Sequence, residues 1–269
     1  MKTRIISGAV GIALLIAVIA IGVRNAAVMC GAMALLTAIG SYEMLRNTSF
    51  VKCPAVLIAA LAYSLAAPFF IGGIVNFTGG YVILIYYLVL TFLTIVFHRE
   101  VDGLTLFSAA AVPVLLSICF TSLFKLFAVH GAKQFYFVLA LVFAWGCDPA
   151  AYFGGMFFGK HKLAPEISPK KTVEGAACGI LGSVLLSLLV CAFYQSTVKV
   201  NYGAVVLAAV IFSVVGMMGD LLTSQIKRGC GIKDFGNIMP GHGGVMDRFD
   251  SVLLVAPCFL SYLIIAKII

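Results

Sequence analysis

The sequence predicts an all-α, polytopic integral membrane protein with about nine transmembrane helices. Of the 269 residues, 62% are hydrophobic and 10% are charged, whereas a soluble domain carries roughly 25% charged residues. The hydrophobic residues also gather in stretches close to the roughly 20 residues that an α-helix needs to cross a bilayer. We therefore expect a multi-pass helical membrane protein and not a soluble domain.

Nine stretches meet this criterion. They cover residues 5–23, 26–45, 54–74, 80–97, 104–124, 134–157, 174–194, 203–222 and 249–267. The first stretch lacks a clear small-residue cleavage site and is followed almost at once by another, so we expect it to be retained and not removed as a signal peptide.

Charge concentrates towards the C-terminus. We therefore predict scaffold helices in residues 1–130 and helices with the functional loops in residues 131–269, within one integral domain.

Lysine and arginine are distributed unevenly between the two sides of this topology. One side holds 13 of them, at the N-terminus and in loops 46–53, 98–103, 158–173 and 223–248, and the other side holds 5. Because cytoplasmic loops are enriched in Lys and Arg, the N-terminus and these loops are predicted to be cytoplasmic and the C-terminus to be outside. Most of the net charge of +8 is then expected on the cytoplasmic face, where it would attract anionic lipid headgroups. Nothing in the sequence indicates nucleic acid.

The segment 219–250, GDLLTSQIKRGCGIKDFGNIMPGHGGVMDRFD, holds eight of the 28 charged residues of the chain. Charge at a membrane boundary is costly unless it is paired or solvated, so it usually marks function. Cations, carboxylates and glycines alternate here. Cations can bind phosphate oxygens, carboxylates can bind a hard metal ion, and glycines let the backbone approach a ligand. The segment therefore predicts a phosphate-binding site.

Three acids in this segment could hold a metal ion. Asp220 ends the eighth predicted span, while Asp247 and Asp250 are spaced i, i+3 at the start of the ninth. Asp220 and Asp247 end consecutive antiparallel helices on one side of the membrane, so we expect them to meet and to bind a hard cation through oxygen atoms. The alternative is that the acids only form salt bridges with nearby cations, namely Lys227, Arg228 and Arg248.

Two upstream features point the same way. Asp148 lies inside the predicted span 134–157, where a carboxylate is a functional candidate by default, although it could instead pack against a neighbouring helix. The segment Ser168–Thr172, SPKKT, opens the seventh predicted span with two lysines and hydroxyl groups, and helix N-termini attract phosphates. The alternative is an ordinary positively charged cytoplasmic loop with a helix cap. The glycines at 154 and 155 are expected to allow close helix packing.

These segments resemble the signature of the phosphatidate cytidylyltransferase family, also called CDP-diacylglycerol synthases. The resemblance rests on SxxKRxxxxKDxG from Ser224 and PGHGGxxDRxD from Pro240, with similar upstream segments at 148–159 and 168–175. It covers residues 145–250, while the first half matches in hydropathy only. Thr223 stands where family members often carry Glu, and Pro149 where a hydroxyl residue is common.

The resemblance implies transfer of CMP from CTP to phosphatidic acid, giving CDP-diacylglycerol and pyrophosphate. It implies a Mg²⁺ cofactor, with room for a second cation, held by Asp220, Asp247 and Asp250. The implied catalytic residues are Asp220, Asp247, Lys227 and Arg228. The implied substrate and phosphate ligands are Ser168, Lys170, Lys171, Lys233, His242, Arg248 and Asp148. The expected partners are CTP, phosphatidic acid and the bilayer of a bacterial cell membrane, and a homodimer is compatible with the sequence.

Two other functions are also compatible with the sequence. A related enzyme could use CTP to activate another lipid phosphate, such as that of an isoprenoid ether lipid. An anion transporter would also place charge near membrane spans, but it would be expected to gather binding groups near the bilayer midplane in repeated halves. The charges of this chain gather at one interface and in its C-terminal half, which favours the enzyme.

Overall fold

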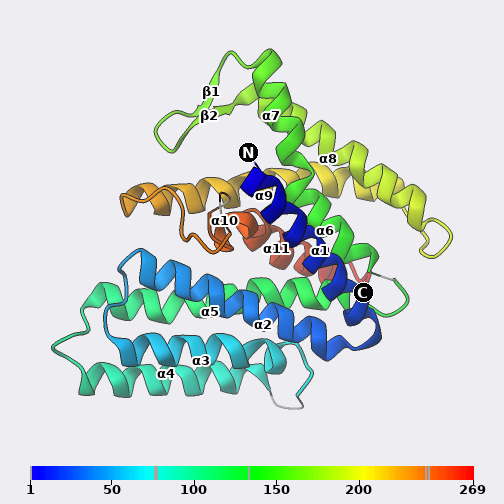
Figure 1. Ribbon diagram of the computed structural model, residues 1–269. Coiled ribbons are helices and arrows are strands. Elements are labelled where there is room, and N and C mark those ends of the chain that lie inside the picture. Colours follow the sequence, from blue (N-terminus) through cyan, green and yellow to red (C-terminus); the bar gives the residue numbers. More distant parts are fainter. Residues whose placement is uncertain (1, 76–77, 133, 240, 242) are drawn as a thin grey trace. The chain divides into compact units, whose positions relative to one another are not determined.

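The structure is a computed structural model that describes residues 2–75, 78–132, 134–239, 241 and 243–269. Helices dominate it, as the sequence predicts (Figure 1). In chain order the elements are α1 (Lys2–Arg24), α2 (Ala26–Tyr42), the π-helical turn η1 (Glu43–Asn47), α3 (Pro54–Ile71), α4 (Gly79–Val96), α5 (Gly103–Phe127), α6 (Phe135–Trp145), α7 (Cys147–Phe158), β1 (Lys162–Ala164), β2 (Ser168–Thr172), α8 (Val173–Tyr194), α9 (Tyr202–Gly229), α10 (Met246–Phe249) and α11 (Val252–Ile265).

Seven helices in the described part of the chain are long and apolar enough to cross a membrane. They are Ala26–Asn47, Pro54–Ile71, Gly79–Val96, Gly103–Phe127, Phe135–Phe158, Val173–Tyr194 and Tyr202–Gly229. Two shorter apolar helices, Ala13–Arg24 and Val252–Ile265, overlap the first and last of the nine predicted spans. The all-α, multi-pass class is confirmed, and the count of nine transmembrane helices stays a prediction.

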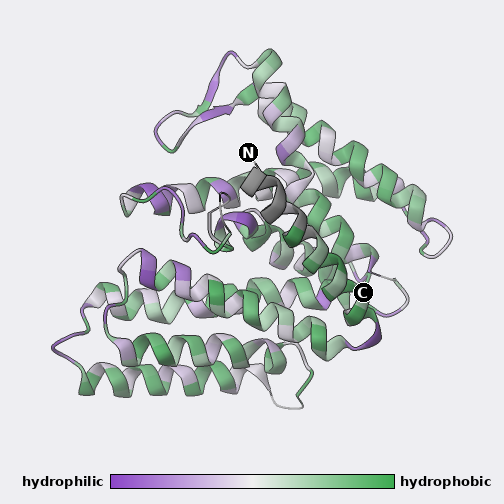
Figure 2. Ribbon diagram, viewed as in Figure 1, coloured by the Kyte–Doolittle hydropathy of each residue, from purple (hydrophilic) through white to green (hydrophobic). Residues whose placement is uncertain are grey.

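Helix α4 shows how this fold suits a bilayer. Its side chains Leu88, Phe92 and Ile95 are 62%, 64% and 69% exposed. A soluble protein rarely exposes so large a contiguous apolar surface, whereas lipid tails are as apolar as these side chains. Figure 2 shows the same pattern along the other long helices, where hydrophobic colour dominates and hydrophilic colour marks β2, α10 and the end of α9.

The chain folds as two compact units. The first comprises Met1–Phe124 and Ile232–Phe249. Within it α2 packs against α3 and α3 against α4, and Tyr63 stacks on Tyr86 with ring centroids 4.3 Å apart. The segment Ile232–Phe249, which carries half of the predicted signature, therefore belongs with the N-terminal helices.

The second unit comprises Lys125–Gly231 and Asp250–Ile269. The predicted span 134–157 is present as α6 and α7, which meet at Gly146. Helix α7 packs closely along α8. A Cβ atom at Gly154 would lie 2.3 Å from the Cβ of Cys178, so no larger residue fits there without movement. This confirms that glycine at this position permits close helix packing.

The β1–β2 hairpin corrects one local prediction. Ser168–Thr172 do not open a helix; they form strand β2, which pairs antiparallel with β1. Pro169 disfavours helical backbone at the residue before it. Helix α8 begins only at Val173, where the extended Thr172 caps it by accepting the N–H of Gly175 at 3.1 Å through Oγ1. Lys170 and Lys171 therefore lie on a strand and not at a helix N-terminus.

Helix α9 extends beyond the predicted span 203–222 to Gly229. Asp220, Ser224, Lys227 and Arg228 consequently share one continuous helix. Because residues three and four apart lie on one helix face, Asp220, Ser224 and Lys227 follow one another along a single stripe.

Candidate active site

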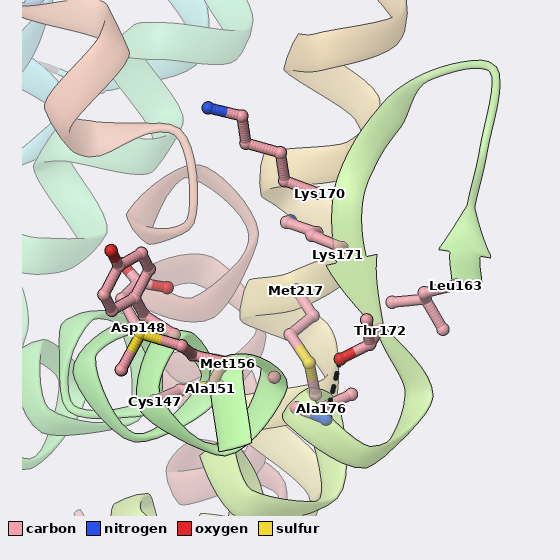
Figure 3. Close-up of a pocket in the computed structure, with 13 residues that line it drawn as sticks. Cys147, Asp148, Ala151, Met156, Leu163, Lys170, Lys171, Thr172, Ala176 and Met217 are labelled. Carbon is pink, nitrogen blue, oxygen red and sulfur yellow. Dashed lines mark hydrogen bonds between the residues drawn. The ribbon is translucent and has the colours of Figure 1, made fainter. Parts of the chain in front are cut away.

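A cavity of about 310 Å³ lies in the second unit between α7 and the β1–β2 hairpin. Asp148 and Met156 of α7 line one side, and Lys170 and Lys171 of β2 line the other (Figure 3). The remaining lining residues are mostly apolar, and they are Cys147, Ala151, Tyr152, Gly155, Leu163, Thr172, Gly175, Ala176 and Met217. The cavity thus combines an apolar wall with two cations and one acid.

The hairpin that carries the two lysines is anchored at its base. Lys162 pairs with Thr172 across the two strands. At the start of α8, Glu174 accepts the backbone N–H of Lys160 through Oε2 at 3.0 Å. The Nδ1 atom of His161 lies 2.6 Å from Oε1 of the same carboxylate. These contacts fix the end of the hairpin nearest the membrane helices, and with it the position of β2.

Lys171 links the cavity to helix α9 through an ion pair with Asp220. The side chains of Lys171 and Asp220 are 26% and 25% exposed, so solvent reaches both. Ser224, one turn further along α9, donates its hydroxyl to Oδ1 of Asp220 at 3.3 Å. The sequence predicted both Lys171 and Asp220 as site residues, and the structure brings them together.

Asp250 belongs to the same acidic group. It lies in the turn just before α11, and its carboxylate accepts the N–H of Ser251 at 2.8 Å. Burial raises the pKa of Asp250 to about 7, and the negative charge of Asp220 adds to the rise. Lys227, which is 7% exposed, opposes the rise with its positive charge. Asp220, Asp250 and Lys227 therefore interact electrostatically in the second unit.

The donor chemistry of this group fits a hard cation. Asp220 and Asp250 offer only carboxylate oxygens, and magnesium is usually held by one or two carboxylates together with substrate phosphates and water. In the part of the chain that the structure describes, no three His, Cys, Asp or Glu side chains form a complete metal cage.

In the first unit, Asp247 organises the segment that contains it. The side chain is 8% exposed. Its Oδ2 atom accepts the N–H of Phe235 at 2.8 Å and the N–H of Gly244 at 2.9 Å. Asp247 therefore ties the two ends of a loop together in addition to any role towards a metal ion. Its predicted meeting with Asp220, which lies in the other unit, stays a prediction.

Glu43 is the functional candidate that the sequence analysis did not single out. It lies in η1, is fully buried, and accepts the N–H groups of Val245 and Met246 at 3.0 and 2.8 Å. One signal was available, because Glu43 is the only acid among the first 99 residues and falls inside the predicted span 26–45. An acid inside a span is a functional candidate by default.

The remaining predicted residues differ in exposure. Arg228, Lys233, Arg248 and Lys170 are exposed, which leaves their side chains accessible to anionic ligands. Ser168 is half-buried on β2. His242 lies outside the described residues.

Comparison with known sequences identifies the family of this chain. A sequence model of the cytidylyltransferase family matches residues 2–266. The chain belongs to the cytidylyltransferase family. The match includes both compact units, and so it includes the N-terminal helices for which the sequence analysis found agreement in hydropathy only.

Several relatives in this family carry the name phosphatidate cytidylyltransferase. The protein of Bacillus subtilis is 40% identical over 153 residues, which cover 56% of this chain and 55% of that protein. The protein of Staphylococcus epidermidis is 44% identical over 122 residues, covering 45% and 46%. The protein of Staphylococcus haemolyticus is 40% identical over 131 residues, covering 49% and 50%. The matched part thus spans about half the length of these relatives.

Proposed function

We propose that this chain is a phosphatidate cytidylyltransferase, which transfers CMP from CTP to phosphatidic acid. The family match over residues 2–266 carries the proposal, and the names of the relatives support it. The cavity in the second unit adds independent support. A lipid phosphate needs cations for its headgroup and an apolar surface for its tail, and Lys170, Lys171, Tyr152 and Met156 offer both in one place.

The reaction needs no nucleophile from the protein. An oxygen of the lipid phosphate attacks the α-phosphorus of CTP, and a new P–O bond forms. The bond between the α-phosphorus and the bridging oxygen to the β-phosphate breaks, and pyrophosphate leaves with that electron pair. Because both substrates are strongly anionic, catalysis depends mainly on positioning and on offsetting charge.

The protein groups have separate tasks in this reaction. Lys170 and Lys171 would bind phosphate oxygens in the cavity, and Arg228 at the end of α9 would bind the triphosphate in a fork. Asp220 and Asp250 would hold Mg²⁺, which when bound offsets the charge on the phosphates. Asp247 is a further predicted ligand. The orientation inferred from Lys and Arg would place these groups at the cytoplasmic face of a bacterial cell membrane.

A labelled-substrate assay tests the proposal. The purified chain in lipid nanodiscs receives Mg²⁺, phosphatidic acid and CTP labelled either on the α- or on the γ-phosphorus. We expect α-label in a lipid product and γ-label in pyrophosphate. Diacylglycerol, which lacks the phosphate, should give no product. An isoprenoid ether lipid phosphate in place of phosphatidic acid distinguishes the related activity, and failure of all lipid phosphates to accept the α-label contradicts the proposal.

A further inference from the structure

We infer that Glu43 is a positioning residue, which holds the segment Gly244–Asp247 in the geometry needed for cytidylyl transfer. The inference rests on the proposed function for its catalytic consequence, but the anchoring itself concerns only contacts within the first unit. Glu43 and this segment are separated by about 200 positions in sequence.

The two oxygens of Glu43 are both used by backbone donors. Oε1 accepts the N–H of Val245 at 3.0 Å, and Oε2 accepts the N–H of Met246 at 2.8 Å. Asp247 accepts the N–H of the preceding residue, Gly244, at 2.9 Å. Three successive backbone N–H groups are therefore held by two carboxylates. Because charge-assisted hydrogen bonds are stronger than neutral ones, this stretch of backbone is firmly fixed.

Two glycines show that the segment is built around this carboxylate. A Cβ atom at Gly236 would lie 2.3 Å from Oε1 of Glu43, and one at Gly244 would lie 2.6 Å from both oxygens. Either methyl group would displace the carboxylate or the backbone. The loop thus approaches Glu43 from two places in its sequence, and glycine at both is required by the closeness of the contact.

The π-helical turn places a second anchor beside the first. Asn47, four residues after Glu43 in η1, donates its Nδ2–H to the carbonyl of Phe235 at 2.6 Å. Phe235 also donates its own N–H to Asp247 at 2.8 Å. Single turns of π-helix occur frequently at functional sites. Here the turn directs two polar side chains at the segment that carries Asp247 and Arg248.

A buried carboxylate is an expensive way to stabilise a fold. Glu43 is fully buried, and the negative charge of Asp247 adds electrostatic repulsion to the cost of removing the carboxylate from water. Apolar packing could join the two segments at lower cost. Apolar packing cannot supply a fixed backbone geometry at residues 244–246. Such precision matters because a displacement near 1 Å at a reacting group can lower the rate about 100-fold.

The variant Glu43→Gln tests the inference with little change in size. A glutamine keeps one acceptor oxygen but turns an NH₂ group towards a backbone N–H, so one of the two hydrogen bonds is lost. Glu100→Gln, at an exposed glutamate of the same unit, is the matched control. Hydrogen–deuterium exchange of the full chain in nanodiscs should rise at least about tenfold at Val245 or Met246 in Glu43→Gln and remain unchanged in Glu100→Gln. Unchanged exchange at both amides would overturn the inference.

Kinetics then separate positioning from a merely structural role. We expect Glu43→Gln to raise the Mg²⁺ concentration needed for half-maximal rate at least about threefold, because the segment that carries Asp247 is no longer held. Loss of folded protein alone would lower the maximal rate and leave this half-saturation value unchanged, and that result would contradict positioning. If the wild-type chain itself transfers no CMP, the proposed function fails, while the exchange measurement still decides whether Glu43 anchors the segment.

The glycine contacts provide a second test. In Gly236→Ala the new methyl group meets Glu43, so exchange at Val245 and Met246 should rise as it does in Glu43→Gln. Gly103→Ala, where a Cβ meets nothing within 4 Å, is the control and should leave exchange unchanged. If Gly236→Ala behaved like Gly103→Ala, the close contact with the carboxylate would be absent and the anchoring inference would be wrong.

Discussion

The ammonium group of Lys171 forms an ion pair with the carboxylate of Asp220, and this contact joins strand β2 to helix α9. Each partner is about three-quarters covered, and each has a proposed ligand of its own: a phosphate for Lys171 and Mg²⁺ for Asp220. On the proposed function, the carboxylate of Asp220 would bind Mg²⁺ and the ammonium of Lys171 would bind a phosphate, so each group would exchange its partner in the ion pair for a ligand. On the proposed function, we expect the ion pair to keep both groups in position before the substrates bind.

Removal of the Lys171 ammonium should impair substrate use more than stability. We expect Lys171→Ala to lower kcat/KM for CTP at least about tenfold, which corresponds to about 1.4 kcal/mol of transition-state stabilisation. The ion pair is partly solvated, and such pairs contribute little to folding, so Tm should hardly change. Lys162→Ala, on the neighbouring strand and outside the cavity lining, is the control. Equal kinetics of both variants would contradict a phosphate role for Lys171.

Two of the three predicted metal ligands, Asp220 and Asp247, should each be needed for turnover. Asp220→Asn and Asp247→Asn are expected to abolish activity while the protein still inserts into membranes, because each loses a charged oxygen ligand for Mg²⁺. Asp102→Asn is a suitable control, since Asp102 is exposed, caps α5 by accepting the N–H of Thr105 at 2.7 Å, and Asn caps helices about as well. Full activity of either purified site variant would remove that residue from the metal assignment.

Arg228 should not be replaceable by lysine. Its guanidinium group can bind two phosphate oxygens in a fork, whereas lysine offers a single point charge. We expect Arg228→Lys to lower kcat/KM for CTP at least about tenfold with little effect on Tm, since the side chain is exposed at the end of α9. Arg99→Lys, at another exposed arginine, should have normal kinetics. Normal CTP kinetics in Arg228→Lys would mean that this arginine does not form a fork with the triphosphate.

The close packing of α7 against α8 predicts a large stability effect at one glycine. The Cβ of Gly154→Ala would meet the side chain of Cys178 at 2.3 Å, so the helices must separate. Overpacking of this kind typically costs about 1–3 kcal/mol. Gly80→Ala, where a Cβ meets nothing within 4 Å, should be neutral or slightly stabilising because alanine favours helices. Thermal unfolding in detergent measures both, and equal Tm values would contradict the packing.

The distribution of Lys and Arg predicts which loops face the cytoplasm. A cysteine placed at Lys162 or Asn237, in a background without the native cysteines, should react with a membrane-impermeant reagent only after the cells are opened. A cysteine at Lys199, on the side with fewer cations, should react in intact cells and serves as the control. Efficient labelling of the first two positions in intact cells would reverse the predicted orientation.

Several features of this protein were determined by the sequence alone. Long apolar stretches decided the all-α membrane class, because a helix is the structure in which a single segment can satisfy its own backbone in lipid. The paired motifs that begin at Ser224 and Pro240 indicated the family before any geometry was known. Both signals are local in the chain, and composition and spacing are sufficient to recognise them.

Tertiary structure decided how distant groups meet. No local pattern in the sequence connects the segments that these contacts join. One contact is the ion pair between Lys171 and Asp220. The others are the hydrogen bonds that Glu43 accepts from the N–H groups of Val245 and Met246. The strand at Ser168–Thr172 was also missed, because proline is acceptable both in an edge strand and at the first turn of a helix. A buried acid such as Glu43 resembles any other interruption of a span in the sequence, and only folding brings to it the backbone donors that offset its charge.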